Sequence, residues 1–167
     1  LTPLKRTLNL ESLHMEANQI SDLTPLSELK NLRTILLNRN RITDLTPLAG
    51  LPKLEYLDLY GNQITDLTPL AGLKQLNVLK LRDNPKLSRP EIDALKRALP
   101  NLVIFHSLMT NDERIEANIR LEVEKYGGEL TEQDLAKSTW IRIEHSIISD
   151  LTPLKRTLNL ESLHMEA

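Results

Sequence analysis

The sequence predicts an α/β solenoid, in which short parallel strands form a curved sheet and short helical or 3₁₀ returns lie on its convex side. Three observations predict this fold class. Leucine recurs with a constant period of 22 residues, part of each period alternates apolar and polar residues, and most periods end in Asp-Leu-Thr-Pro, a helix-starting turn. One such unit cannot bury its apolar faces alone, so neighbouring units must stack around one continuous core.

Four blocks of this period follow one another without a gap, at residues 1–22, 23–44, 45–66 and 67–88. The third reads LTPLAGLPKLEYLDLYGNQITD. Leu or Ile fills block positions 1, 4, 10 and 13 and usually 15 and 20, and Asn fills position 18 each time. This pattern resembles the leucine-rich repeat, and its spacing is similar to the internalin-type class of that family. The resemblance implies a capped solenoid that binds partners on its concave face.

The physics of one block can be followed in the third. In LEYLDLYGN the three leucines are expected to point inward, while Tyr56, Asp58 and Tyr60 alternate outward as in a strand. The Asn at position 18 is suited to satisfying backbone groups of the turn, because its amide both donates and accepts hydrogen bonds. The return segment should then begin with Thr46 as N-cap and Pro47 as the first helical residue.

After residue 88 the period breaks. Residues 89–108 are expected to form a closing cap, with an amphipathic helix over Arg89 to Leu99 and a strand over Leu102 to Phe105. This segment is similar to the C-terminal cap of bacterial members of the family.

The pattern of a new domain start then follows. Residues 109–134 are expected to form a helical N-terminal cap, with a first helix ended by Gly127-Gly128 and a second begun by Thr131 in a capping-box-like pattern. Residues 135–150 are expected to form a zeroth repeat, because a strand-like stretch from Trp140 is followed by SIISD, which matches the end of a block.

Residues 151–167 are identical to residues 1–17. We interpret the chain as a circularly permuted frame of a parent domain ordered 109–150, 1–88 and 89–108, with one segment duplicated. An engineered origin is the favoured interpretation, and a fragment of a natural tandem array is the alternative.

The permutation separates the two caps. Five to six strands spaced by about 4.8 Å place the ends of the solenoid about 25 Å apart, whereas the link from Phe105 to Asn111 reaches at most about 20 Å. The N-terminal cap is therefore expected not to fold back onto the first repeat of its own chain. Two apolar repeat ends would then stay uncovered, and they are complementary by construction.

Head-to-tail self-association of copies of the chain, into a ring or a fibre, is the predicted consequence. The residues expected at the two ends are Leu1, Leu4, Leu10, Leu13, Met15, Leu151, Leu154, Leu160, Leu163 and Met165. An alternative is an engineered two-frame switch, in which either copy of the duplicated segment completes the same fold.

A binding module for a protein ligand is the alternative from another class of function. The side chains expected on the concave face are Trp140, Arg142, His14, Leu36, Asn38, Tyr56, Asp58, Tyr60, Lys80 and Arg82. Aromatic residues on a rigid sheet are common binding anchors, although aromatic and β-branched residues such as Val78 also favour strands for their own sake. The charged residues of this face are more simply explained as cross-strand pairs.

No enzyme, cofactor or metal is expected. The chain has no cysteine, no P-loop, no G-x-S-x-G and no dinucleotide-binding glycine pattern. A zinc site made of His14, Glu16, Glu144 and His145 is conceivable, but no paired-His motif supports it.

The composition also bears on the classes of partner that the chain can bind. A net charge of −2 disfavours a nucleic-acid binder, and no apolar run approaches the roughly 20 residues of a membrane span. No signal peptide opens the sequence, so the localisation is open, with the cytoplasm expected for the chain as it stands.

Overall fold

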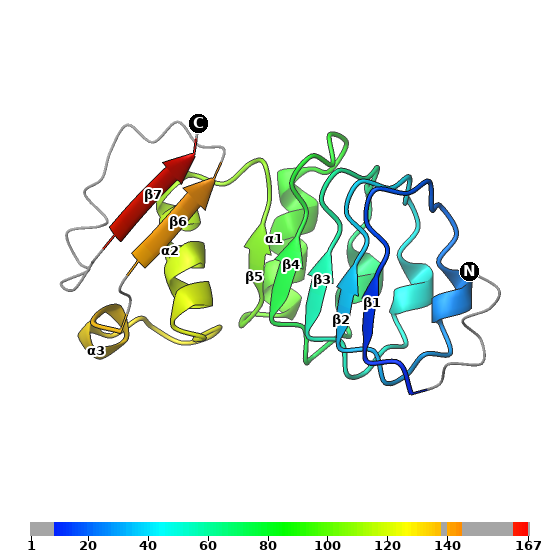
Figure 1. Cartoon of the computed structure of the whole chain (residues 1–167), viewed down its shortest axis with the longest axis horizontal. Coiled ribbons are helices and arrows are strands. Elements are labelled where there is room, and N and C mark those ends of the chain that lie inside the picture. Colours follow the sequence, from blue (N-terminus) through cyan, green and yellow to red (C-terminus); the bar gives the residue numbers. More distant parts are fainter. Residues whose placement is uncertain (1–8, 138–139, 145–161, 167) are drawn as a thin grey trace. The chain divides into compact units, whose positions relative to one another are not determined.

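The computed structural model describes residues 9–137, 140–144 and 162–166 (Figure 1). The chain divides into two compact units, unit 1 (Leu1–Ser107) and unit 2 (Leu108–Ala167). Within the described residues, no helix is both long enough and apolar enough to cross a membrane.

Unit 1 contains a parallel sheet whose strands follow one another in chain order. Its strands are β1 (Ser12–His14), β2 (Thr34–Leu36), β3 (Tyr56–Asp58), β4 (Val78–Lys80) and β5 (Val103–Phe105). The first three strand pairs keep a constant offset of one block, because Ser12 lies opposite Thr34, Thr34 opposite Tyr56, and Tyr56 opposite Val78. The predicted open parallel solenoid is therefore confirmed.

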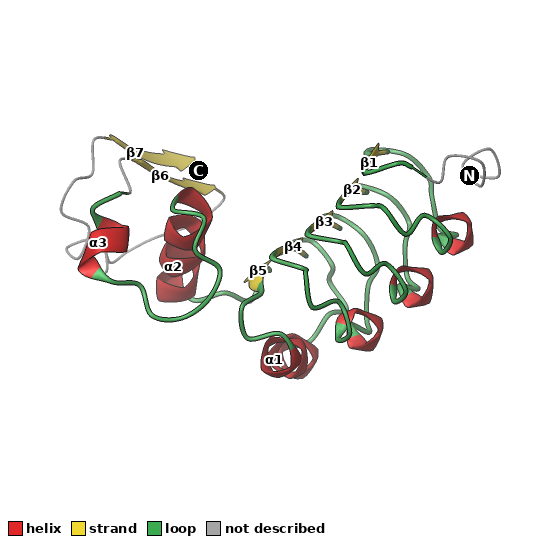
Figure 2. Ribbon diagram, turned by 90° about the horizontal axis from the view of Figure 1, so that it is seen from below, coloured by secondary structure: helices red, strands yellow, loops and turns green. Residues whose placement is uncertain are grey.

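Short helices close each repeat on the other side of this sheet (Figure 2). They are η2 (Thr24–Leu26), η3 (Thr46–Leu48), η4 (Thr68–Leu70) and the longer α1 (Arg89–Ala98). Each 3₁₀ helix carries its proline as the second residue, one place later than predicted for Pro47, and the missing N–H still costs nothing in this first turn.

The expectation that Thr46 is an N-cap was wrong. Thr46 is already the first helical residue, and the residue at the N-cap position, Leu45, makes no side-chain cap hydrogen bond. The side chain of Asp44, one residue before the N-cap position, binds the start of the helix instead, because its Oδ1 accepts the Thr46 amide hydrogen bond at 2.8 Å. Hydrogen bonds from the Thr46 hydroxyl and amide lower the pKa of Asp44. The other two 3₁₀ helices have the same arrangement, with Asp22 before Thr24 and Asp66 before Thr68.

The core of unit 1 is a ladder of aliphatic side chains, and burial depends on the place in the stack. In the second repeat Leu32, Leu37 and Ile42 are fully buried. The equivalent residues of the first repeat are only partly buried, namely Leu10, Met15 and Ile20. The first repeat is therefore an incompletely covered end of the apolar ladder.

Unit 2 begins with α2 (Asn111–Glu122), which packs against β6 (Trp140–Glu144). The helix starts with a capping box, in which the Thr110 hydroxyl accepts the Glu113 amide and the Glu113 carboxylate accepts the Thr110 amide. It ends earlier than the glycine pair at 127–128 led us to expect. Glu124 takes the left-handed conformation just after the helix, with φ of 52°.

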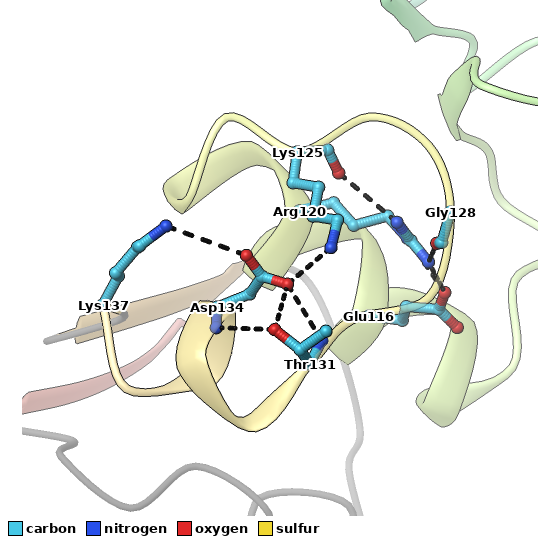
Figure 3. A network of polar contacts seen from close by, with 7 residues as sticks. All are labelled: Glu116, Arg120, Lys125, Gly128, Thr131, Asp134 and Lys137. Atoms are coloured by element: carbon cyan, nitrogen blue, oxygen red, sulfur yellow. Dashed lines mark hydrogen bonds and ion pairs between the residues drawn. The ribbon is translucent and has the colours of Figure 1, made fainter.

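A polar network joins α2 to α3 (Glu132–Leu135) and is centred on Asp134 (Figure 3). The Asp134 carboxylate accepts hydrogen bonds from Lys125 Nζ at 2.6 Å and from the Thr131 hydroxyl at 2.6 Å. The Thr131 hydroxyl in turn accepts the Asp134 amide at 3.2 Å, which confirms the predicted capping-box-like start. Arg120 donates to the Gly128 carbonyl at 2.9 Å and so fixes the intervening loop.

Strand β6 pairs in parallel with β7 (Ser162–Glu166), which belongs to the duplicated segment. Trp140 lies opposite Ser162 and Arg142 opposite His164. This offset is again one block, the same as between neighbouring strands of unit 1. Unit 2 thus contains one repeat-type strand pair, which follows a helical segment in the sequence.

Candidate functional site

The exposed face of the unit 1 sheet gathers aromatic and charged side chains on its middle strands. Tyr56 and Tyr60 are both half-buried. Lys80 Nζ lies 5.6 Å from the centre of the Tyr56 ring, and Arg39 Cζ lies 5.6 Å from the centre of the Tyr60 ring. These distances suit cation–π interactions, which hold the aromatic rings in defined positions.

Asp58 lies between these two tyrosines in the sequence and is the most buried charge of the group. Its side chain is 14% exposed, and its Oδ2 lies 3.9 Å from Lys80 Nζ. Burial raises the pKa of Asp58, and this effect outweighs the opposing influence of the Tyr60 amide and of Lys80. The face therefore presents rigid aromatic edges beside a mixed-charge centre.

The other residues predicted for this face are distributed less compactly. His14 is exposed on β1, while Leu36, Asn38 and Arg82 are half-buried. Val78 occupies the position in its repeat that Tyr56 has in the preceding one, which predicts exposure on this face, but the prediction was wrong because Val78 is only 2% exposed. Its partner on β5 is Val103, which is itself buried.

The unit 2 part of the predicted face is known only from its backbone. Trp140 and Arg142 belong to β6, but their side chains lie outside the described residues. Most of the end residues predicted for self-association also lie outside them, namely Leu1, Leu4, Leu151, Leu154 and Leu160, together with the side chains of Leu163 and Met165.

The asparagines at position 18 form a hydrogen-bonded ladder with a direction. Asn40 Nδ2 donates to the Met15 carbonyl at 2.9 Å, and Asn40 Oδ1 accepts the Ile20 amide at 2.9 Å. Both partners lie in the preceding repeat. Asn62 and Asn84 repeat this pattern one and two blocks later. Each buried amide therefore ties its own turn to the repeat before it.

Asn18 is the member of this series that starts the stack. Its Nδ2 donates to the Glu16 carbonyl at 2.9 Å, a bond within its own turn, and the residue is exposed. The first repeat thus carries the same amide as the others, placed where a preceding repeat would receive it.

The start of the repeat stack has a second feature besides Asn18, namely the edge of β1 that faces away from β2. In the inner repeats, the amide at position 12 donates to the carbonyl at position 11 of the preceding repeat, as from Thr34 to Glu11 at 3.1 Å and from Tyr56 to Arg33 at 3.0 Å. Ser12 occupies the same position in β1, so its amide points away from β2. Among the described strands, β1 and β5 are the edges of the first sheet, and β6 and β7 each have one neighbour in the second.

Position 17 takes a left-handed conformation in all four repeats. The φ angles are 53° at Ala17, 58° at Arg39, 66° at Gly61 and 54° at Asp83. Gly61 is the one residue of this set for which such an angle is easy. The angle turns the chain into the asparagine, and the sequence signals it only through that glycine.

The conceivable zinc cluster is not seen within the described part of the chain. No group of three or more His, Asp or Glu side chains there could hold a metal ion. His145 and the side chain of Glu144, two of the four candidate ligands, lie outside the described residues, so the zinc site stays a prediction.

Comparison with known proteins agrees with this geometry. A family model described as leucine-rich repeats (two copies) matches residues 8–50, 30–72 and 52–97, more than half of the chain. Comparison with the curated proteins gives no match.

Two solved structures are similar. Internalin C2 of Listeria monocytogenes is 29% identical, with a TM-score of 0.57, and the match covers 99% of this chain and 55% of internalin C2. A leucine-rich repeat protein of Leptospira interrogans is 33% identical, with a TM-score of 0.53, over 57% of this chain and 25% of its own length. The chain thus spans about half of the first protein and a quarter of the second. Together with the family match, this shows that the chain belongs to the leucine-rich repeat family, whose members generally mediate protein–protein interactions.

Proposed function

We propose that the chain is a non-enzymatic interaction module that associates with copies of itself, head to tail, through two complementary repeat ends. One observation supports this proposal: the two identical copies of one segment pair through opposite edges of the strand. In unit 1 the segment SLH pairs as β1 with the following repeat, and in unit 2 the same segment pairs within β7 with the preceding one. Within the described part of the chain, each copy therefore leaves open the edge that the other copy uses.

The apolar ladder supports the same proposal. Leu10, Met15 and Ile20 are packed against the core but are covered less than their counterparts in later repeats. Covering them with another repeat removes apolar surface from water, which stabilises the contact by about 25 cal/mol per Å² buried. The two ends differ from each other, so the contact is heterologous and gives a closed ring or an open fibre.

The origin we infer is a permuted and engineered parent solenoid with the N-terminal cap moved behind the C-terminal cap. An exact repetition of 17 residues supports it, together with the one-block offset between β6 and β7. Self-association, rather than ligand binding, is then the property that distinguishes the chain from its parent.

Size-exclusion chromatography with light scattering, over a hundredfold range of concentration, tests the proposal. We expect either a discrete multiple of 19.1 kDa, which indicates a ring, or a mass that rises with concentration, which indicates a fibre. A folded chain that stays at 19.1 kDa at every concentration would contradict it.

A protein ligand on the exposed face of the unit 1 sheet is the second candidate. The two ring–cation contacts of Tyr56 and Tyr60 favour it, because they hold aromatic side chains ready on a rigid sheet. The double substitution Tyr56→Ala and Tyr60→Ala should abolish ligand binding and leave self-association intact. Removal of residues 151–167, which belong to unit 2, should change self-association and leave ligand binding on the unit 1 sheet intact.

A further inference from the structure

We propose that association proceeds by strand exchange: β1 of one chain pairs with β6 of a second copy in the place of β7, and Asn18 completes that contact by binding the backbone of Ile143. This inference rests on the proposed self-association and specifies its partner strand. It differs from simple stacking, in which β7 stays on β6 and its open edge meets β1 of the next chain.

The backbone pattern favours β6 as the partner of β1. The duplicated segment pairs with β6 in the register Trp140–Ser162, Ile141–Leu163 and Arg142–His164. Since residues 12–16 repeat residues 162–166, the same register places Ser12 opposite Trp140 and His14 opposite Arg142. The Ser12 amide already points toward the side on which β6 would lie, as the equivalent amides of later repeats point to their preceding strand.

Asn18 adds a contact that follows the rule of the ladder. In the second repeat, Asn40 Nδ2 donates to the carbonyl of Met15, which is position 15 of the preceding repeat. The residue at position 15 of the zeroth repeat is Ile143, which lies in β6. Asn18 would therefore reach the Ile143 carbonyl once β1 stands beside β6.

Strand exchange is favoured because it replaces the β6–β7 pairing by an equivalent pairing and adds further contacts between the two chains. Identical residues replace identical residues on β6, so the strand pairing that is given up is made again. The incoming β1 brings the whole of unit 1 behind it, and the partly exposed Leu10, Met15 and Ile20 gain a neighbouring repeat. Asn18 also exchanges a local bond for one that binds two repeats together.

Single-cysteine chains test the exchange directly, since the protein has no cysteine of its own. Two variants, His14→Cys and Arg142→Cys, are mixed, refolded together from denaturant and oxidised. Neighbouring strands bring their Cα atoms within the range that a disulfide spans. Exchange predicts a disulfide-linked heterodimer of these two variants. The double variant Arg142→Cys with His164→Cys is the positive control, because those two residues are already partners.

The combination of His14→Cys with His164→Cys distinguishes the competing arrangement. If that pair cross-links and His14→Cys with Arg142→Cys does not, β7 stays in place and the exchange is overturned while self-association stands. Assembly with neither cross-link overturns the exchange as well. A chain that neither cross-links nor exceeds 19.1 kDa in light scattering overturns both the exchange and the proposed function.

Substitution at Asn18 tests the second half of the inference. Asn18→Ala should weaken self-association about tenfold, as expected for one interfacial hydrogen bond, and leave the far-ultraviolet circular dichroism unchanged. Gln19→Ala, at the neighbouring exposed position, is the matched control and should not change the association constant. Equal behaviour of the two variants would show that Asn18 takes no part in the contact.

Discussion

The two copies of the 17-residue segment have the same sequence but different surroundings. Among the described strands, the first copy starts the five-stranded sheet of unit 1 and pairs only with the strand that follows it. The second copy pairs only with the strand that precedes it. The strand is three residues long in the first copy and five in the second. Sequence alone therefore does not decide how such a segment pairs, because both of its edges are competent and the available neighbour selects one.

The largest expected effect is the difference in stability loss between an asparagine inside the repeat stack and the one at its end. Asn62→Ala should lower the free energy of unfolding of unit 1 by about 3 kcal/mol, because the Ile42 amide and the Leu37 carbonyl would lose their buried partner. Asn18→Ala should lower it by less than about 0.5 kcal/mol, since its bond is local and exposed. Urea denaturation followed by circular dichroism, at concentrations below association, measures both.

A similar loss at both asparagines would mean that the first repeat already has a preceding neighbour in the monomer. That result would remove the open end on which the contrast between the two copies depends.

Proline substitution probes the two edges separately. Ser162→Pro removes an amide on the β6 side of β7 and should destabilise unit 2 by about 2 kcal/mol. Ser12→Pro removes the equivalent amide on the open side of β1, and should cost unit 1 less than about 1 kcal/mol while abolishing self-association. Trp140, the one tryptophan of the chain, lies in β6, and its fluorescence reports on unit 2.

The result that would contradict this expectation is a Ser12→Pro chain that still assembles with unchanged affinity. Association would then not involve the open edge of β1.

A smaller effect is expected at position 17, whose left-handed geometry is shared by all four repeats. Gly61→Ala should destabilise unit 1 by about 1 kcal/mol, because φ there is 66°. Gly72→Ala is the matched control: it has no positive φ and no atom within 4 Å of an added Cβ, so it should be neutral or slightly stabilising. Thermal unfolding of the two variants measures the difference, and an equal response would refute a requirement for this conformation.

The smallest predicted effect concerns acid. Hydrogen bonds from Lys125 and Thr131 lower the pKa of Asp134, so the ionised carboxylate stabilises unit 2 at neutral pH. That contribution is lost as the pH falls below about 4, the usual pKa of an aspartate. Asp134→Asn should flatten the acid limb of the Trp140 fluorescence transition, whereas Asp66→Asn should alter only the circular dichroism of unit 1. A steep acid limb in Asp134→Asn would exclude this residue as its source.

The repeat itself could be predicted from the sequence, and some of its contacts could not. A constant period fixes the strand register, because equivalent residues of successive blocks must stack to keep the leucines together. The pattern Asp-Leu-Thr-Pro fits a helix start with either Asp or Thr as the capping residue, and the structure shows that the side chain of Asp44 binds the start of the helix. The burial of Val78 depends on the closing strand β5, which does not follow the period.

The direction of the asparagine ladder was also beyond the sequence. The recurrence of Asn at position 18 indicates that an amide is needed, but not which backbone it meets. The structure shows that Asn40 reaches both its own turn and the repeat before it. Part of the candidate face, at Trp140 and Arg142, stays a prediction.

Because the offset between neighbouring strands is constant, successive repeats of the solenoid are evenly spaced. Every inner repeat meets its neighbours through the same register, the same amide ladder and the same aliphatic positions. One more block of 22 residues, inserted between two inner repeats, would create no new kind of contact and would leave both ends as they are. Each insertion should lengthen the subunit by about 4.8 Å, so that the spacing along an assembly becomes adjustable in equal steps.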